Sequence, residues 1–161
     1  MTESQTGRSR LAIVASKGSL DWAYPPLMMA VQAARKGWDV GIFFTFYGLN
    51  IIHKEKGKDL KIAPVGNPAM PMPVPTLMGA LPGMTALATH AMAKRIRAQE
   101  VPTVPELLEE AIGRGVKLWP CGFTVDVFGY EPEDFIEGCE ERSGSPAFLE
   151  YAKDADVTIF V

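Results

Sequence analysis

Short apolar runs alternate with segments of helical periodicity along this chain. The first run, residues 11–15, has the length of a buried strand and is followed by polar residues typical of a loop. Apolar side chains then recur at helical spacing from Leu27 to Ala34, and Gly37 ends that pattern before a second apolar run at residues 40–46. A strand, helix, strand unit of this kind normally has parallel strands and a right-handed crossover.

Proline positions indicate where several helices begin. We expect Pro25 and Pro26 near the first turn of the first helix, where backbone N–H groups have no partner within the helix. Thr103 followed by Glu106 three residues later predicts a capping box. Ser145 is expected to cap the last helix, with proline at the next position.

The rest of the chain continues the alternation of strands and helices. Further strands are expected at residues 60–65, 116–120 and 157–161. Further helices are expected at residues 49–55, 84–99 and 145–152, and from residue 103 to about Gly113 or Gly115. This order predicts an α/β domain with a mostly parallel five-stranded sheet, covered by helices on both faces. We expect residues 11–161 to form this single domain and the polar residues 1–10 to form a disordered tail.

Composition and charge exclude several classes of protein. The chain has 161 residues, of which 47% are hydrophobic and 22% are charged, so it is not a disordered, collagen-like or disulfide-scaffold chain. Its net charge of −3, without a cluster of Lys or Arg, disfavours nucleic acid and anionic membranes as partners. Residues 1–10 contain no apolar stretch that could act as a signal peptide, so we expect a cytoplasmic location.

Residues 62–93 form a segment of 32 residues without a single Asp, Glu, Lys or Arg. A membrane span is the first interpretation, since a bilayer-crossing helix needs about 20 apolar residues. Six prolines interrupt the segment and disfavour a span, although proline-kinked helices keep the alternative open. Five of the eight methionines lie here, and because methionine suits adaptable contact surfaces we expect a subunit interface rather than an internal loop.

Cys121 is the candidate for chemistry. It follows the strand expected at 116–120 and precedes a short run that could form a helical turn. A thiol at the start of a helix faces unpaired amide groups, which lowers its pKa and favours the thiolate, the nucleophilic form. The alternative is a small buried hydrophobic residue, the more common role of a free cysteine. Cys139 lies among acidic residues that would raise its pKa, so we assign it no role.

The loop after the first strand is a second candidate site at the same edge of the predicted sheet. Lys17 and Trp22 lie in it, and its backbone could hold an anion. No dinucleotide-binding or P-loop glycine pattern is present, and a solvated loop is the simpler interpretation. His53 and His90 are isolated and the cysteine spacing fits no zinc site, so we expect neither a metal nor a cofactor.

Four stretches of the chain resemble the DsrE/DsrF/DsrH-like sulfur-relay family. They are residues 15–26 (ASKGSLDWAYPP), 41–49 (GIFFTFYGL), 66–71 (GNPAMP) and 81–85 (LPGMT), and the resemblance extends over nearly the whole chain. It is greatest to the stand-alone branch described as peroxiredoxin-like or as DsrE-like sulfurtransferases. The resemblance implies a flavodoxin-like three-layer fold, a homo-oligomer, and one cysteine, here Cys121, that carries persulfide sulfur. The residues on either side of Cys121 depart from the family pattern, which affects the pocket's shape and the choice of partner.

The leading hypothesis is therefore a cytoplasmic sulfur carrier or sulfurtransferase. Cys121 would hold sulfane sulfur as a persulfide and exchange it with a TusA-like or rhodanese-like partner. The supporting pocket is expected to include Gly122, Phe123, Thr124, Lys17 and Trp22. Two alternatives remain at this point: a non-catalytic oligomeric module that binds a small anion or nucleotide, and a membrane-peripheral subunit that uses residues 62–93 as its contact surface.

Overall fold

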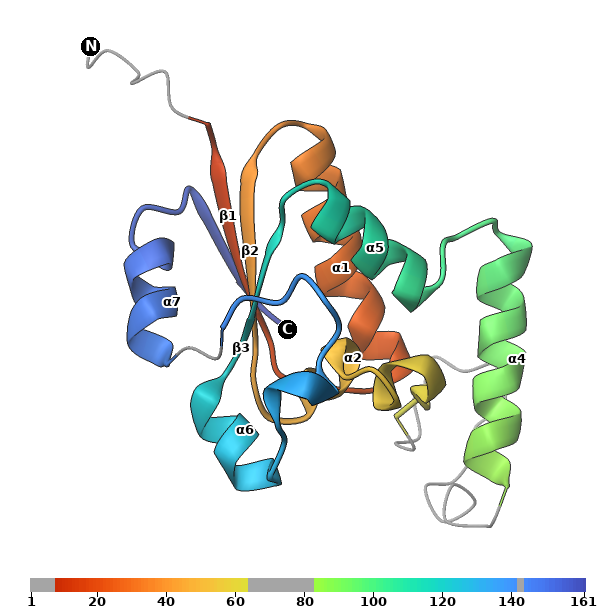
Figure 1. The fold of residues 1–161 in the computed structure, drawn as a ribbon. Coiled ribbons are helices and arrows are strands. Elements are labelled where there is room, and N and C mark those ends of the chain that lie inside the picture. The colour runs from red at the N-terminus through yellow and green to blue at the C-terminus, as the bar shows by residue number, and fades with distance from the viewer. Residues whose placement is uncertain (1–7, 64–82, 142–143) are drawn as a thin grey trace.

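A parallel four-stranded sheet forms the centre of this computed structural model, which describes residues 8–63, 83–141 and 144–161 (Figure 1). The strand order is β3–β2–β1–β4, and every neighbouring pair is parallel. The strands are β1 (Arg10–Ala15), β2 (Asp39–Phe44), β3 (Lys117–Pro120) and β4 (Val157–Phe160). The α-helices are α1 (Leu20–Arg35), α2 (Leu49–Ile52), α4 (Met84–Ala98), α5 (Val104–Gly113), α6 (Gly122–Phe128) and α7 (Ser145–Ala152), with short 3₁₀ helices η1 (Phe46–Gly48), η2 (Lys56–Asp59) and η3 (Pro132–Asp134).

Helices cover both faces of the sheet, as the sequence predicts. α1 and α5 pack together on one face, where alternate strand residues such as Ile13, Ile42 and Leu118 are fully buried. α7 covers the other face, where the ring of Phe148 stacks on that of Phe43 with centroids 5.0 Å apart. Figure 1 shows the resulting three layers, with α7 on one side of the strands and α1 and α5 on the other.

The expectation of a fifth strand at residues 60–65 is wrong for residues 60–63, the part that the structure describes. The backbone of this segment bonds to helices instead of to another strand. The carbonyl of Lys61 accepts from the N–H of Leu20, and the N–H of Ile62 donates to the hydroxyl of Thr89 on α4. The apolar run therefore connects the start of α1 to α4, and the sheet that the structure describes has four strands.

Two expected helix starts differ from the structure, and one is confirmed. α1 begins at Leu20, so Pro25 and Pro26 lie in its second turn rather than its first. α7 is capped by Gly144, and Ser145 is its first residue rather than its cap. The capping box of α5 is present, since the side chains of Thr103 and Glu106 each accept a hydrogen bond from the other's backbone N–H.

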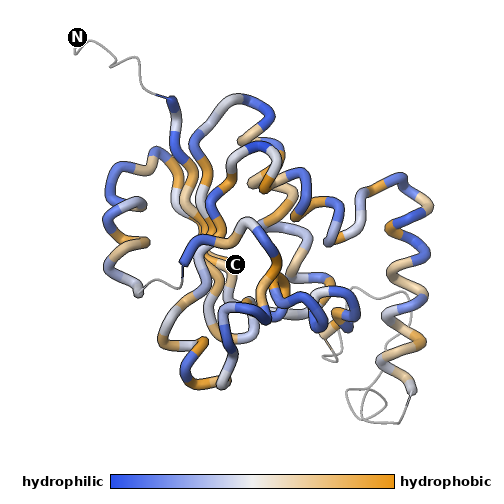
Figure 2. Tube along the Cα trace, in the orientation of Figure 1, coloured by the Kyte–Doolittle hydropathy of each residue, from blue (hydrophilic) through white to orange (hydrophobic). Residues whose placement is uncertain are grey.

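Only part of the charge-free segment lies within the described residues. Residues 64–82 and residues 1–7 of the expected tail lie outside them, and Arg10, also expected in the tail, begins β1. Helix α4 confirms the helix expected at 84–99, and it has no buried residue. Figure 2 shows that its hydrophilic residues gather towards its C-terminal end, where Lys94, Arg95 and Arg97 lie. Among the described residues, no helix combines the length and apolar character needed to cross a bilayer.

Candidate functional site

The carboxyl ends of β1, β2 and β3 lie side by side at one edge of the sheet. Their register aligns Ala15 with Phe44 and Phe44 with Pro120. The N–H of Cys121 donates to the carbonyl of Phe44 at 2.9 Å, so this residue extends the ladder of β3 by one position. The carbonyl of Cys121 accepts from the N–H of Val125, also at 2.9 Å, and so begins the hydrogen bonding of α6. Cys121 is thus the junction of strand and helix, where the sequence places it.

The Cys121 side chain lies on the α7 face of the sheet, packed with Ala12, Phe43 and Phe148, and is 4% exposed. Burial raises the pKa of a thiol, because the thiolate loses hydration. Here hydrogen bonds from four donors outweigh burial: the hydroxyl and amide of Thr124, the hydroxyl of Thr45 and the amide of Phe123. The net effect lowers the pKa of Cys121 below its ordinary value, so the thiolate fraction is larger than in an ordinary cysteine.

Thr124 connects the start of α6 to the end of β2. Its side chain is 1% exposed, and its hydroxyl oxygen lies 3.2 Å from that of Thr45. The same oxygen accepts from the N–H of Phe46 at 3.1 Å. Phe46 has a φ of 46°, in the left-handed region that is uncommon for a residue with a side chain, so this bond helps to hold a strained turn next to the cysteine.

Thr45 and Phe46 are residues of the site that the sequence analysis missed. Both directly follow β2, which is the neighbour of β3 in the sheet. The signal that could have found them is therefore strand order: residues after adjacent parallel strands meet at the same edge. The expected pocket included residues from the ends of the first and fourth expected strands only, although β2 lies between β1 and β3 in the sheet.

The other residues of the expected pocket divide into two groups. Phe123 and Thr124 lie against Cys121, and Gly122 begins α6 beside it. Lys17 and Trp22 are paired with each other instead: the ammonium of Lys17 lies 3.2 Å from the centroid of the Trp22 ring, a cation–π contact. Neither is among the groups that shift the pKa of Cys121. The lysine that could have compensated the thiolate charge is thus engaged elsewhere.

Cys139 is also a free thiol, but its pKa is shifted in the opposite direction from that of Cys121. Burial first, and then the charge of Glu140, raise its pKa to about 12, so it is protonated at neutral pH. The sequence predicts the direction from the acidic neighbours, and the structure adds burial as the larger cause. The two cysteines therefore differ in thiolate fraction, the property that sets thiol reactivity.

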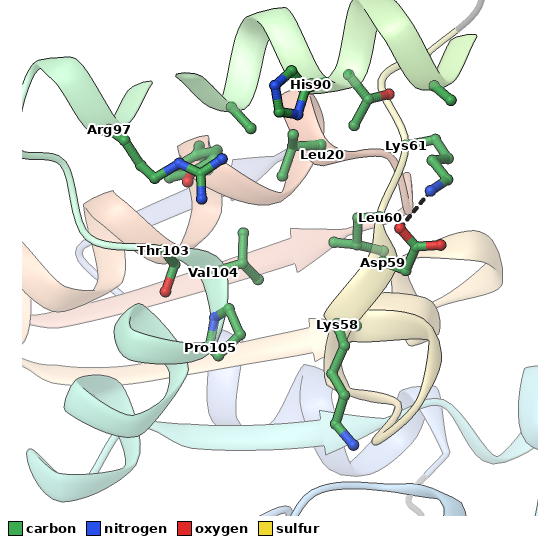
Figure 3. Close-up of a pocket in the computed structure, with 15 residues that line it drawn as sticks. Leu20, Lys58, Asp59, Leu60, Lys61, His90, Arg97, Thr103, Val104 and Pro105 are labelled. Carbon is green, nitrogen blue, oxygen red and sulfur yellow. Dashed lines mark hydrogen bonds and ion pairs between the residues drawn. The ribbon is translucent and has the colours of Figure 1, made fainter. Parts of the chain in front are cut away.

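Two cavities in the described residues lie away from Cys121, which lines neither of them. The first, of about 370 Å³, lies between α4, the start of α1 and the start of α5. Figure 3 shows His90 and Arg97 extending from α4 above Leu20 and Val104, with Lys61 paired to Asp59 at the opposite side. The second, of about 340 Å³, lies beside α5 and His53. The thiol lies at the edge of the sheet, apart from both of these cavities.

The chain is similar in sequence to two curated proteins over nearly its whole length. The chain is 41% identical over 160 residues to the sulfur carrier protein DsrE2 of Allochromatium vinosum, covering 96% of this chain and 99% of that protein. It is 28% identical to the uncharacterized protein YrkE of Bacillus subtilis over the full length of both.

Solved structures share the fold at low sequence identity. The YchN protein of E. coli superposes with a TM-score of 0.58 at 12% identity, covering 95% of this chain and 99% of YchN. The protein of unknown function MTH1491 from Methanobacterium thermoautotrophicum gives a TM-score of 0.51 at 9% identity, covering 94% and 98%. Residues 7–160 match the sequence pattern of one family from end to end, and the chain belongs to that family, the DsrE/DsrF/DrsH-like family.

Proposed function

We propose that this chain is a cytoplasmic sulfur carrier that holds sulfane sulfur as a persulfide on Cys121 and passes it to the thiol of a partner protein. The observation that carries the proposal is the position of Cys121 between the end of β3 and the start of α6, where groups of Thr45, Phe123 and Thr124 lower the pKa of a largely buried thiol. The sulfur carrier that is 41% identical supports it. Both cysteines are free, which suits a reducing compartment.

Loading is a transfer between thiolates. The Cys121 thiolate attacks the outer sulfur of a donor persulfide, a new S–S bond forms on Cys121, and the donor's S–S bond breaks. The donor cysteine leaves as a thiolate, which takes a proton from solvent. One sulfane sulfur moves and no net oxidation occurs, so the step requires no cofactor. The donors that stabilise the thiolate also stabilise the anionic persulfide, and unloading is the same step in reverse with an acceptor thiolate.

We assign the partners to TusA-like or rhodanese-like proteins, which carry sulfur on a cysteine of their own. The chain acts as a homo-oligomer in this proposal, with residues 62–93 contributing to the subunit contact. Helix α4 supports this assignment, because none of its residues is buried although Met84, Met92 and Ile96 are apolar.

The test is intact-mass spectrometry of the protein after incubation with inorganic polysulfide. Wild type should gain about 32 Da, the mass of one sulfur atom, and a thiol reductant should remove it. Cys121→Ser should gain nothing, whereas Cys139→Ser, the matched control, should load as wild type does. An adduct that persists in Cys121→Ser, or that is lost in Cys139→Ser, contradicts the assignment.

A further inference from the structure

An exposed apolar surface lies around the buried Cys121. Of the nine large hydrophobic side chains that are exposed in the described residues, four come from two short segments at this edge of the sheet. They are Phe46 (52% exposed) and Tyr47 (65%) from η1, and Phe123 (65%) and Val127 (59%) from α6. We call these four residues the apolar rim.

Contacts between the two segments make the apolar rim one surface. The rings of Phe46 and Phe123 lie edge to face with centroids 6.5 Å apart, and the ring of Tyr47 lies 5.6 Å from that of Phe128 on α6. Phe123 and Val127 are four residues apart on the helix and so share one side of it. Figure 1 shows α6 below the end of β3, at the same end of the sheet as the turn that follows β2. An exposed surface of this kind indicates a binding site for another macromolecule.

The surroundings of the rim are acidic. From Leu118 to Glu141 the chain has seven Asp or Glu residues and no Lys or Arg. Asp126 on α6 and Glu131 and Glu133 just after it are exposed. The described cations at this edge of the sheet include Lys54, which donates to the carbonyl of Glu133, and Lys56, which lies over the ring of Tyr130. Lys17, which follows β1, is a third. Carboxylates still outnumber ammonium groups here once Asp134 is counted, so the rim attracts a basic surface.

Resting on the proposed function, we infer that the apolar rim is the docking surface for the sulfur-exchanging partner, and that this partner presents its cysteine on a segment that is apolar beside the cysteine and basic around it. A thiol that is 4% exposed and outside both cavities cannot exchange sulfur with a protein at a distance. The partner's cysteine must therefore contact the edge of the sheet beside Cys121. The rim supplies the apolar contact for this, and the carboxylates select the charge of the partner.

Two synthetic cysteine persulfide peptides test the inference. Both have the same apolar residues beside the cysteine, and one carries four lysines where the other carries four glutamates. Transfer to the protein is followed as the gain of about 32 Da per sulfur atom. The basic peptide should load wild type on the order of tenfold faster at low ionic strength, and the ratio should shrink at 0.5 M salt because charge attraction is screened.

Variants of the rim separate docking from thiol chemistry. Tyr47→Ser and Val127→Ser should slow transfer from the basic peptide severalfold and leave loading by inorganic polysulfide unchanged. Leu149→Ser, at 63% exposure on α7, is the matched apolar control and should transfer as wild type does. Glu133→Lys should reduce the preference for the basic peptide, whereas Glu109→Lys on α5 should not.

Three results would overturn the inference while leaving the proposed function intact. The first is that both rim variants receive sulfur from the basic peptide as fast as the wild-type protein does. The second is equal or faster transfer from the acidic peptide. The third is a change in native mass caused by the rim variants, which would make the rim a contact between copies of this chain. Failure of wild type to load from polysulfide would instead contradict the proposed function itself.

Discussion

Replacing Thr124 by valine probes the link between the site's hydrogen bonds and both stability and thiol chemistry. Valine has nearly the shape of threonine, so packing at this 1% exposed position is retained. What is lost is the acceptor for the Phe46 N–H, 3.1 Å away, and the partner of the Thr45 hydroxyl. A buried donor without an acceptor costs about 1–3 kcal/mol, so we expect the free energy of unfolding to fall by about 2 kcal/mol. In a chain of this size the melting temperature should fall by roughly 4–8 °C.

The same substitution should raise the pKa of Cys121. Burial, which opposes the thiolate, is unchanged, while the hydroxyl bond from Thr124 that favours the thiolate is removed. The assay is the pH dependence of alkylation by iodoacetamide, followed by intact mass, and its midpoint should move to higher pH. Thr158→Val, at an exposed threonine of β4, is the control and should leave midpoint and stability unchanged. A midpoint that is unmoved or lower in Thr124→Val would refute the assignment of these bonds to the thiolate.

The pH dependence of folding stability should also reflect the lowered pKa of Cys121. Because folding lowers the pKa of Cys121 from its ordinary value of 9.0, the thiolate adds stability that appears as pH rises through the folded pKa and is complete above 9.0. The stability of wild type relative to Cys121→Ser should therefore increase as pH rises towards 9.0. In Thr124→Val that increase should be smaller and should begin at higher pH. A constant difference across this range in wild type would mean that the pKa is not lowered.

Three further predictions concern other parts of the fold. A Cβ on Gly48 would lie 2.1 Å from the carbonyl oxygen of Ala15, so Gly48→Ala should lower the free energy of unfolding by about 1–3 kcal/mol in urea titrations. Gly113→Ala, with nothing within 4 Å at the end of α5, should leave it unchanged or raise it by up to about 1 kcal/mol. Two arginines hold the pKa of Glu110 at about 2, so its charge contributes stability that is lost as pH falls from 4.5 towards 2; thermal melts should show a smaller acid loss in Glu110→Gln. Cys139 should resist iodoacetamide at pH 8 in the native protein and react in guanidinium, as peptide mapping would show.

Local sequence signals predicted most elements of the fold correctly. β1 and β3 are apolar runs of strand length, and the capping box at Thr103 depends only on residues three apart. The apolar run at 60–63 was misassigned for the same reason, since its pattern is that of a strand. Its backbone groups instead bond to Leu20 and Thr89, which are distant in the sequence, and the run itself contains no sign of those partners.

The candidate cysteine could be chosen from sequence because its position between a strand and a helix is a local property. Its chemistry could not be, because two of its hydrogen-bond donors approach from different segments: Thr124 follows it by three residues, but Thr45 comes from the end of β2. Lys17 shows that a residue expected at the site from its sequence position can have its side chain directed elsewhere. It reaches the same edge of the sheet, yet its ammonium group stacks on Trp22 rather than approaching the thiol.

The sequence by itself determined the α/β class, the sheet edge that carries Cys121, and the unequal characters of the two cysteines, because apolar periodicity, capping residues and neighbouring charges all act over a few residues. Only the tertiary structure decided that the described sheet has four strands, that Thr45 and Thr124 surround the thiol, and that Phe46, Tyr47, Phe123 and Val127 form one exposed rim. The physical reason is that these features depend on strand order and on the packing of segments 78 and 79 residues apart, which the local pattern of the chain does not encode.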